Sequence, residues 1–178
     1  MRLIILGPPG AGKGTQSKLI AKKYGLRNVS IGDVLRKEIK KKTKLGLKVK
    51  PYIEHGDLAP DSIVYKIIKP YLLKGRFIMD GFPRHMSQVK LIREKINAAI
   101  FLDCNKEKII KRLLKRKELE HRKDDDDITI EYRWLIYKKK TFPVIEYYKK
   151  KGIVITINGN PGIKTVFKNI TEKLNEIF

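Results

Sequence analysis

A glycine-rich segment near the N-terminus leaves few folds open to this chain. Its sequence is Gly7-Pro8-Pro9-Gly10-Ala11-Gly12-Lys13-Gly14-Thr15, between an apolar run at Leu3–Leu6 and helical spacing at Thr15–Tyr24. Glycines allow the backbone to wrap closely around a phosphate, and the start of a helix adds favourable partial charge. Lys13 supplies a cation for phosphate oxygens. The segment therefore predicts a P-loop, although Gly14 stands where the strict motif has Ser or Thr.

Short aliphatic runs alternate with longer amphipathic segments along the rest of the chain, which is typical of a parallel sheet with crossover helices. The predicted strands are Leu3–Leu6, Asn28–Ser30, Phe77–Met79, Ala99–Leu102 and Ile153–Ile157. Helical spacing is present at Thr15–Tyr24, Asp33–Lys41, Ser62–Leu73, Ser87–Lys95, Lys106–Arg116, Thr129–Lys150 and Ile163–Ile177. We expect a three-layer α/β fold of the P-loop NTPase type, with a five-stranded parallel sheet and helices on both faces.

The composition excludes several classes of protein. A length of 178 residues predicts one domain, and 42% hydrophobic residues are too many for a disordered basic tail. The single cysteine, Cys104, can form neither an internal disulfide nor a four-thiolate zinc site. No apolar run is long enough to cross a membrane, and the apolar run after Arg2 is too short for a signal-peptide core. These features predict a cytosolic protein.

A net charge of +22 suggests nucleic-acid binding, because clustered cations release counterions from a phosphate backbone. The basic residues lie in several short runs, at 40–42, 138–140 and 149–151, rather than in one arm or patch. We interpret these runs as solvated helix faces, and we expect any nucleic-acid binding to be incidental and confined to low salt. A basic nucleic-acid-associated protein on a P-loop fold stays an alternative from a different class.

A second motif, Asp80-Gly81-Phe82-Pro83-Arg84, follows the strand predicted at Phe77–Met79. An acidic residue at the carboxyl end of a strand beside the P-loop strand is suited to Mg²⁺, directly or through water. Asp80 is therefore a candidate magnesium residue. Arg84, four positions later, is close enough to the same crevice to hold a second phosphate.

Two segments exceed a minimal alternation of strands and helices. Residues 36–73 contain several helical pieces punctuated by glycine and proline, and residues 117–127 are strongly charged and almost without apolar side chains. We interpret both as elements that move on a fixed core.

Together these motifs resemble the nucleoside monophosphate kinases, and most closely the adenylate kinases. The similar segments are Gly7–Gln16, Ser30–Arg36, Gly56–Asp61, Asp80–Arg84 with Gln88, and Arg122–Asp125 with Arg133. They follow one another in the family's order over essentially the whole chain. The resemblance implies a core of residues 1–29, 61–116 and 128–178, a helical insertion at 30–60 that binds the nucleoside monophosphate, and a short lid at 117–127. Lid closure is a documented property of adenylate kinases.

The resemblance implies reversible transfer of the γ-phosphoryl group of Mg·ATP to AMP, which gives two ADP. Such a transfer needs alignment and charge neutralisation more than covalent chemistry. By similarity, the catalytic cations would be Lys13, Arg84, Arg116, Arg122 and Arg133. The ATP phosphates and base would lie against Gly10, Ala11, Gly12, Lys13, Gly14, Thr15, Arg112 and Pro161, with Arg112 stacked on the base and the main chain of 159–161 beside it.

The acceptor and metal sites are implied in the same way. AMP would contact Ile31, Arg36, Asp57, Leu58, Ala59, Gly81, Phe82, Pro83, Arg84, Gln88, Arg122 and Arg133, with the Gln88 amide on the adenine edge. Magnesium would be held mostly through water by Asp80, Asp33 and Thr15. Four consecutive carboxylates at 124–127 are expected to cap the following helix, and Asp124 and Asp125 are expected to accompany lid closure as well.

Two positions depart from the family pattern. Ile31 stands where adenylate kinases usually have Thr, whose hydroxyl faces the acceptor base, but Gln88 still offers two hydrogen bonds to adenine, so AMP is favoured. UMP/CMP kinase activity is the alternative, and the donor stays open between ATP and GTP. The lid is short and contains no cysteine, which excludes a zinc-bearing lid.

Overall fold

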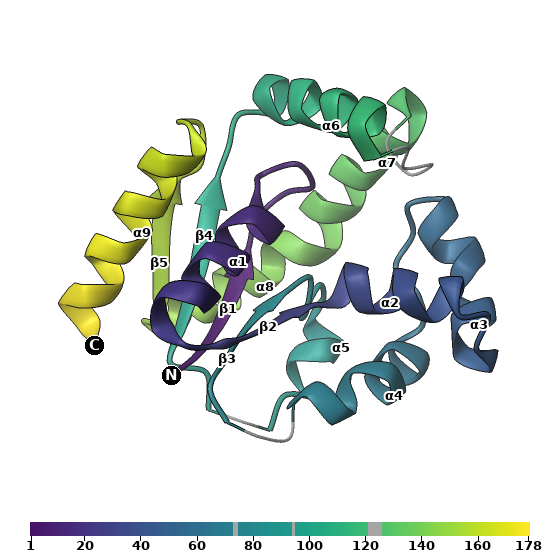
Figure 1. Cartoon of the computed structure of the whole chain (residues 1–178), viewed down its shortest axis with the longest axis horizontal. Helices are drawn as coiled ribbons and strands as arrows, with labels where there is room; N and C mark the ends of the chain where they lie inside the picture. The colour runs from purple at the N-terminus through teal and green to yellow at the C-terminus, as the bar shows by residue number, and fades with distance from the viewer. Residues whose placement is uncertain (73–74, 94, 121–125) are drawn as a thin grey trace.

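The computed structural model describes residues 1–72, 75–93, 95–120 and 126–178. Its strands form one parallel sheet in the order β2-β3-β1-β4-β5 (Figure 1). The bounds are Arg2–Leu6 for β1, Arg27–Ser30 for β2, Phe77–Asp80 for β3, Ala98–Asp103 for β4 and Val154–Asn158 for β5. The predicted five-stranded parallel sheet is confirmed, and each strand begins and ends within one residue of its prediction.

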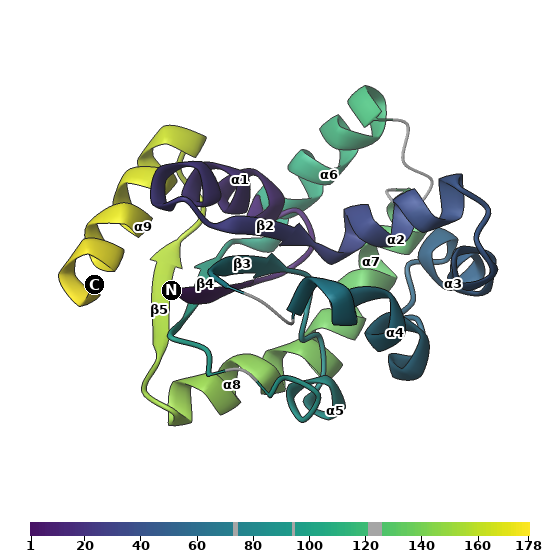
Figure 2. The same ribbon diagram turned by 60° about the horizontal axis from the view of Figure 1, so that its bottom comes forward.

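Helices cover both faces of the sheet (Figure 2). On one face lie α1 (Lys13–Tyr24) and α9 (Ile163–Ile177), and on the other lie α5 (Met86–Val89) and α8 (Phe142–Lys150). This arrangement confirms the predicted three layers.

Alternate residues of β1 supply the two halves of the core. Leu3 and Ile5 pack in the cluster that includes residues of α1 and α9, whereas Ile4 and Leu6 pack in the cluster that includes residues of α8. All four side chains are at most 3% exposed. A strand buried on both faces has no solvent-exposed side, which is why Leu3–Leu6 of β1 are all apolar.

The remaining helices lie beyond one edge and above the carboxyl ends of the strands (Figure 1). To the right in that view are α2 (Ile31–Lys40), α3 (Lys44–Glu54) and α4 (Asp61–Leu72), and at the top are α6 (Lys106–Glu120) and α7 (Asp127–Ile136). None of the helices within the described ranges has the length and apolarity that crossing a bilayer requires.

The helix predicted at Thr129–Lys150 is continuous but contains one turn of different geometry. A π-helical turn, η2 (Tyr137–Thr141), separates α7 from α8, and the backbone N–H of Phe142 donates to the oxygen of Tyr137, five residues earlier. Pro143 follows, has no N–H, and its ring clashes with the carbonyl four residues before it in a regular α-helix. The wider turn accommodates this proline, and π turns of this kind often occur at functional sites.

The prediction of a helix at Ser87–Lys95 was wrong beyond its first turn, since α5 ends at Val89. Beyond it the described backbone makes short turns, with Leu91 N–H donating to Gln88 O and Ile92 N–H to Val89 O. Val89, Leu91 and Ile92 pack against the core, so their apolar spacing reflects a packed irregular segment rather than a helix face.

Two features lie within the lid predicted at residues 117–127. Helix α6 continues to Glu120, four residues past its predicted end, and residues 121–125, which include Arg122, Asp124 and Asp125, lie outside the described residues. Asp126 caps α7 as predicted, because its carboxylate accepts hydrogen bonds from the backbone N–H (2.9 Å) and hydroxyl (2.8 Å) of Thr129. These bonds lower the pKa of Asp126.

Candidate active site

The P-loop joins β1 to α1 and lies close against β4 and α6. Its backbone φ is +144° at Gly7 and +79° at Gly10, a region that favours glycine. A Cβ atom at Gly7 would lie 2.7 Å from the backbone oxygen of Leu102, and one at Gly10 would lie 2.8 Å from Cγ of Leu113. A larger residue at either position would displace the loop.

Lys13 is the first residue of α1 and folds back over the loop. Its Nζ donates hydrogen bonds to the backbone oxygens of Gly7 (2.9 Å) and Pro8 (2.7 Å). Burial lowers the pKa of Lys13 to about 8, against the attraction of Asp80. Neighbouring cations lower this pKa further, namely Arg84, Arg133 and Arg116. The ammonium group therefore belongs to a concentration of positive charge that an anionic ligand would stabilise.

Asp80 ends β3 directly beside the P-loop strand, in register with Ile5. Burial raises the pKa of its carboxyl group, although Lys13 and Arg84 oppose the rise. A Cβ atom at Gly14 would lie 3.4 Å from Asp80 Oδ2, so the carboxylate approaches the first turn of α1.

Asp33 and Arg36 lie one turn apart in α2 and form an ion pair, with Oδ1 and Nη2 separated by 2.5 Å. Burial opposes ionisation of Asp33, but hydrogen bonds from Arg36 and Ser30 outweigh it and lower the pKa of this carboxyl group. The pair lies in the first two turns of α2 and lines the same cavity as the P-loop.

A cavity of about 950 Å³ brings the predicted residues together at the carboxyl ends of the strands. The predicted residues that line it are Gly10, Ala11, Gly12, Lys13, Gly14, Thr15, Ile31, Asp33, Arg36, Asp57, Leu58, Ala59, Asp80, Gly81, Pro83, Arg84, Gln88, Arg112, Arg116, Arg133 and Pro161. Phe82 is 1% exposed and packs in the core, so its side chain lies away from the cavity wall. Arg122 lies outside the described residues.

Arg84 stands in the segment that follows β3, after a cis peptide bond between Phe82 and Pro83. Its Nε donates to the backbone oxygen of Gly81 (3.0 Å), and its own backbone oxygen accepts from the Thr141 hydroxyl (2.8 Å). Thr141 belongs to the π-helical turn, so η2 fixes the segment that carries Arg84. Neither Thr141 nor Tyr137, which also lines the cavity, was among the residues predicted from the sequence.

Arg112 organises the loop between β5 and α9. Its guanidinium donates to the backbone oxygens of three consecutive residues, Gly159 (2.9 Å), Asn160 (3.1 Å) and Pro161 (3.1 Å). A Cβ atom at Gly159 would lie 2.3 Å from the Cys104 sulfur, so the loop packs closely on the Cys104 side chain. Arg112 therefore holds this wall of the cavity in place, and its predicted stacking on a base stays a prediction.

The loop between α3 and α4 contacts α7. The Tyr132 hydroxyl donates to Asp57 Oδ1 (2.6 Å), and this bond raises the pKa of Tyr132. Beside it, a Cβ atom at Gly56 would lie 2.6 Å from Thr129 Cγ2 and 2.9 Å from Arg133 Cγ. The backbone of residues 56–57 thus packs directly on the helix that carries Arg133, a contact that no periodic pattern in the sequence indicates.

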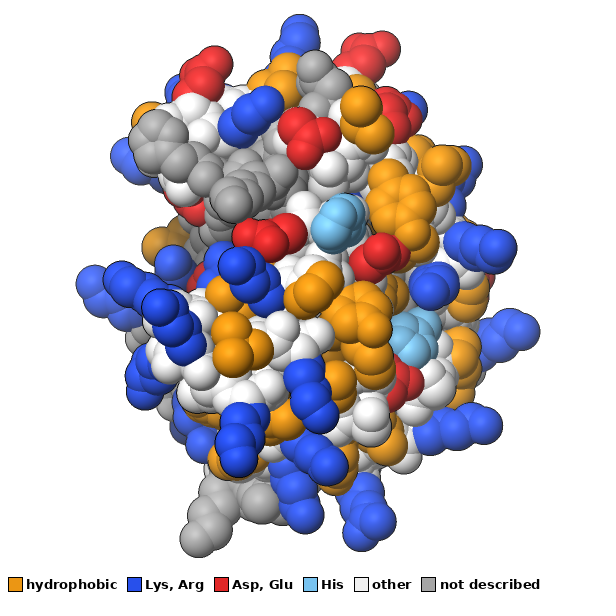
Figure 3. All heavy atoms as spheres, turned by 90° about the vertical axis from the view of Figure 1, so that its right-hand side faces the viewer, with side chains coloured by type: hydrophobic (Ala, Val, Ile, Leu, Met, Phe, Trp, Pro, Cys, Tyr) orange, Lys and Arg blue, Asp and Glu red, His pale blue; other side chains and the backbone are white. Residues whose placement is uncertain are grey.

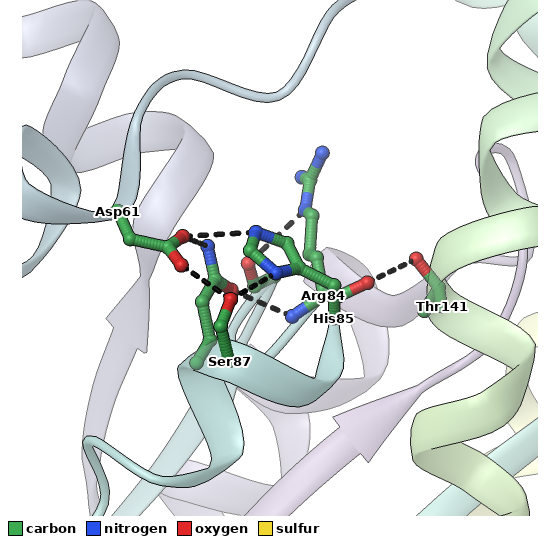
Figure 4. Close-up of polar contacts among 7 residues, drawn as sticks. Asp61, Arg84, His85, Ser87 and Thr141 are labelled. Carbon is green, nitrogen blue, oxygen red and sulfur yellow. Dashed lines mark hydrogen bonds and ion pairs between the residues drawn. The ribbon is translucent and has the colours of Figure 1, made fainter.

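A further group lies just behind the cavity wall and was not predicted as a site. Asp61, His85 and Ser87 form a hydrogen-bonded cluster with the amide of Gln88 (Figure 4). The sequence contains Asp61 and Gln88 in two separate motifs, but their 2.8 Å contact joins residues 27 positions apart. Only the fold brings them together.

The sheet order, the loop after β1 and the shared cavity define a P-loop phosphotransferase, because the cations converge where phosphates lie on such a loop. The family model described as "Adenylate kinase" matches residues 5–153. This chain belongs to the adenylate kinase family.

Curated relatives are similar to this chain in sequence over nearly its full length. The chain is 40% identical to "Adenylate kinase" of Leptospira biflexa serovar Patoc (strain Patoc 1 / Ames) over 184 residues, covering 97% of this chain and 99% of the relative. It is 38% identical to "Adenylate kinase" of Archaeoglobus fulgidus over 216 residues (99% of each chain). It is 37% identical to "Adenylate kinase" of Clostridium botulinum (strain Langeland / NCTC 10281 / Type F) over 212 residues (98% of each chain).

Proposed function

We propose that this chain is an enzyme that transfers the γ-phosphoryl group of Mg·ATP to AMP, reversibly, to give two ADP. Its family membership supports this activity. The observation that carries the proposal is that one cavity is lined both by the P-loop with Lys13 and by Arg84 and Gln88. A donor on the P-loop and an acceptor beside Gln88 would therefore share one enclosed space, as direct transfer requires.

The roles proposed for the side chains come from the family resemblance, and their shared position on the cavity wall supports them. Lys13 and the P-loop backbone would hold the transferring phosphoryl group, and Arg36 and Arg84 would hold the acceptor phosphate. Arg116 and Arg133, with Arg122, would neutralise the oxygens of the group in flight. No side chain needs to form a covalent bond in this scheme.

The acceptor base would lie between Ile31 and Gln88. Ile31 is 2% exposed and lines the cavity, so it offers an apolar surface where a hydroxyl is usual. Gln88 also lines the cavity and supplies the polar contact. We therefore favour AMP over UMP, since the amide complements the adenine edge and opposes the O4/N3–H edge of uracil. Cytosine offers the same donor and acceptor pair as adenine on a smaller ring, so AMP is favoured over CMP by family membership rather than by the amide.

Magnesium fits the oxygen-bearing residues of the cavity. Asp80, Asp33 and Thr15 all line it, and oxygen ligands are those that Mg²⁺ prefers. Within the described ranges no three His, Cys, Asp or Glu side chains cluster closely enough to enclose a metal ion. We propose that the contact is mostly through water, with the nucleotide phosphates completing the shell. When bound, the ion would neutralise charge on the β- and γ-phosphates.

We propose that residues 30–60 form the acceptor-binding insertion and residues 117–127 a short lid on a core of 1–29, 61–116 and 128–178. The alignments with the Archaeoglobus and Clostridium relatives extend over 216 and 212 positions, more than the 178 residues of this chain. The alignment with the Leptospira relative extends over 184. These lengths support a compact form of the enzyme, shorter than the Archaeoglobus and Clostridium relatives.

No specific observation favours the nucleic-acid alternative. On the face shown in Figure 3, Lys and Arg side chains are scattered among apolar and uncharged ones rather than gathered in a stripe. Binding along a nucleic acid would require such a continuous track.

The test is ADP formation from Mg·ATP with AMP, UMP, CMP, GMP or dAMP offered separately, with the Lys13→Ala variant as control. We expect turnover to be fastest with AMP and to require Lys13. Preference for UMP or CMP would show that Ile31 has redefined the base pocket. Equal turnover without Lys13 would refute the kinase proposal.

The lowered pKa of Lys13 predicts pH-dependent ATP binding. Below a pH of about 8 the ammonium group is charged in the free enzyme and attracts the triphosphate, and above it the charge is lost. The Kd for ATP should therefore rise as pH increases through about 8, which isothermal titration calorimetry between pH 7 and 9.5 would measure. The Lys13→Met variant should bind ATP weakly with a flat profile, and an equally steep profile in that variant would assign the titration to another group.

A further inference from the structure

The amide of Gln88 is fixed at both of its ends. Its Oε1 accepts a hydrogen bond from the backbone N–H of Arg84 (2.7 Å), and its Nε2 donates to Asp61 Oδ1 (2.8 Å). A backbone N–H can only donate, and a carboxylate can only accept. Turning the amide over would set two donors against each other at one end and two acceptors at the other. The direction of this amide therefore follows from the chemistry of its partners.

Asp61 is itself held firmly. It is the first residue of α4, where the helix dipole favours a negative charge. Its Oδ2 accepts from the Ser87 hydroxyl (2.5 Å), and its Oδ1 lies 2.8 Å from His85 Nε2. His85 Nδ1 and Ser87 Oγ are 2.6 Å apart, which closes the ring of contacts. Both carboxylate oxygens are thus engaged, and the group cannot turn away from Gln88 without breaking several bonds.

Gln88 alone in this cluster belongs to the cavity wall. Its side chain is 3% exposed and lines the cavity, whereas Asp61, His85 and Ser87 are not among the residues that border it. With one N–H and one lone pair used inside the protein, the amide retains one N–H and one lone pair for a ligand. Any influence of Asp61 on a ligand must pass through these two atoms.

The two classes of purine present opposite patterns to such an amide. Adenine has an amino donor at C6 beside the acceptor N1, whereas a 6-oxopurine has an oxo acceptor at C6 beside the donor N1–H. An amide that can turn over pairs with either edge. An amide of fixed direction pairs with only one of these two edges. Against the other edge it places donor next to donor and acceptor next to acceptor, which leaves buried polar groups unpaired.

We infer that Asp61 is a positioning residue that fixes the direction of the Gln88 amide, and that the acceptor site thereby selects 6-aminopurine over 6-oxopurine nucleotides. The inference rests on the proposed function, because it takes Gln88 as the residue that meets the acceptor base. It assigns the discrimination to a side chain that does not touch the nucleotide.

The test compares AMP with IMP, which differs from it at C6 and N1 of the base. In Asp61→Asn the new side chain has the same shape but can either donate or accept, so of the two bonds that hold the Gln88 amide only the one from the Arg84 N–H still requires its present direction. We expect the ratio of kcat/KM for AMP to kcat/KM for IMP to fall about 10-fold or more, the effect of one charge-assisted hydrogen bond. The KM for ATP should stay unchanged. A general loss of active protein would lower both rates and leave the ratio intact.

Two further variants separate the possible failures. Ser87→Ala removes a bond to the other carboxylate oxygen and leaves the Gln88 contact, so its ratio should stay within about threefold of wild type. Gln88→Ala should abolish most of the discrimination, and an unchanged ratio there would refute the proposed contact with the base. If Gln88→Ala lowers the ratio while Asp61→Asn preserves it, the inference about Asp61 is overturned. Asp61→Ser, which keeps a hydroxyl at the helix start, repeats the comparison if the asparagine variant does not fold.

Discussion

Replacing Lys13 with methionine is expected to abolish most of the turnover while making the folded protein more stable. Removal of one well-placed charge on a transferring group costs on the order of 10²–10³ in rate. Stability should change in the opposite direction, because burial lowers the pKa of Lys13 from 10.5 to about 8, which corresponds to roughly 3 kcal/mol against the charged form at neutral pH. Loss of its hydrogen bonds to Gly7 and Pro8 offsets about 2 kcal/mol of this.

A net gain of about 1 kcal/mol in the free energy of unfolding should raise the Tm by roughly 2–4 °C at pH 7. The pH dependence of stability checks whether the Lys13 charge destabilises the fold. Between about 8 and 10.5 the unfolded chain binds more protons than the folded one, so wild-type stability rises with pH and the advantage of the variant shrinks. Calorimetric melting at pH 7 and pH 10 would measure both effects. A lower Tm for Lys13→Met at pH 7 would contradict the expected cost of burying this charge.

Replacing Arg84 with methionine is expected to lower kcat/KM for AMP by about 10²–10³ and to leave the Kd for ATP nearly unchanged. The side chain lines the cavity beside Gly81, and its charge acts on both Lys13 and Asp80. Arg84→Lys should recover only part of the loss, since an ammonium group cannot reproduce the planar fork of a guanidinium. Steady-state kinetics with varied AMP would measure the change.

A matched control is available at Arg76, an exposed arginine that donates to the backbone oxygen of Tyr24 at the opposite end of β3. Arg76→Met makes the same change of charge away from the cavity and should keep kcat/KM within about twofold of wild type. If the two variants lost activity equally, the effect would come from net charge and the assigned role of Arg84 would be refuted.

The strands and most helices could be predicted because their signals are local. Apolar runs bounded by glycine predicted the strands of the sheet. The P-loop was predicted from a glycine-rich segment between a strand that ends at Leu6 and a helix that begins at Lys13. The π turn could not be predicted in this way, because helical spacing continues unchanged through Tyr137–Thr141. Similarly, apolar spacing over Ser87–Lys95 did not distinguish a helix from an irregular segment packed on the core.

The residues of the site that belong to a sequence motif could be predicted. The residues that orient them through tertiary contacts could not. The sequence indicated Lys13 and Asp80 by motif and position, and indicated Gln88 by resemblance, but not the partners that orient them. The bonds from Tyr132 to Asp57 and from Thr141 to Arg84 join residues 75 and 57 positions apart. Single polar residues of this kind have no periodicity, so only the packed structure shows which ones meet.

The contact between Gly56 and α7 has a consequence for the fate of ATP. The loop backbone lies so close to Thr129 and Arg133 that even a methyl group would overlap them, which leaves no space for a solvent molecule between the two. Exclusion of solvent from a phosphoryl-transfer site suppresses hydrolysis as a competing reaction. The absence of a side chain at residue 56 thus keeps solvent out of this part of the cavity wall, which favours transfer of the phosphoryl group to a nucleotide over hydrolysis.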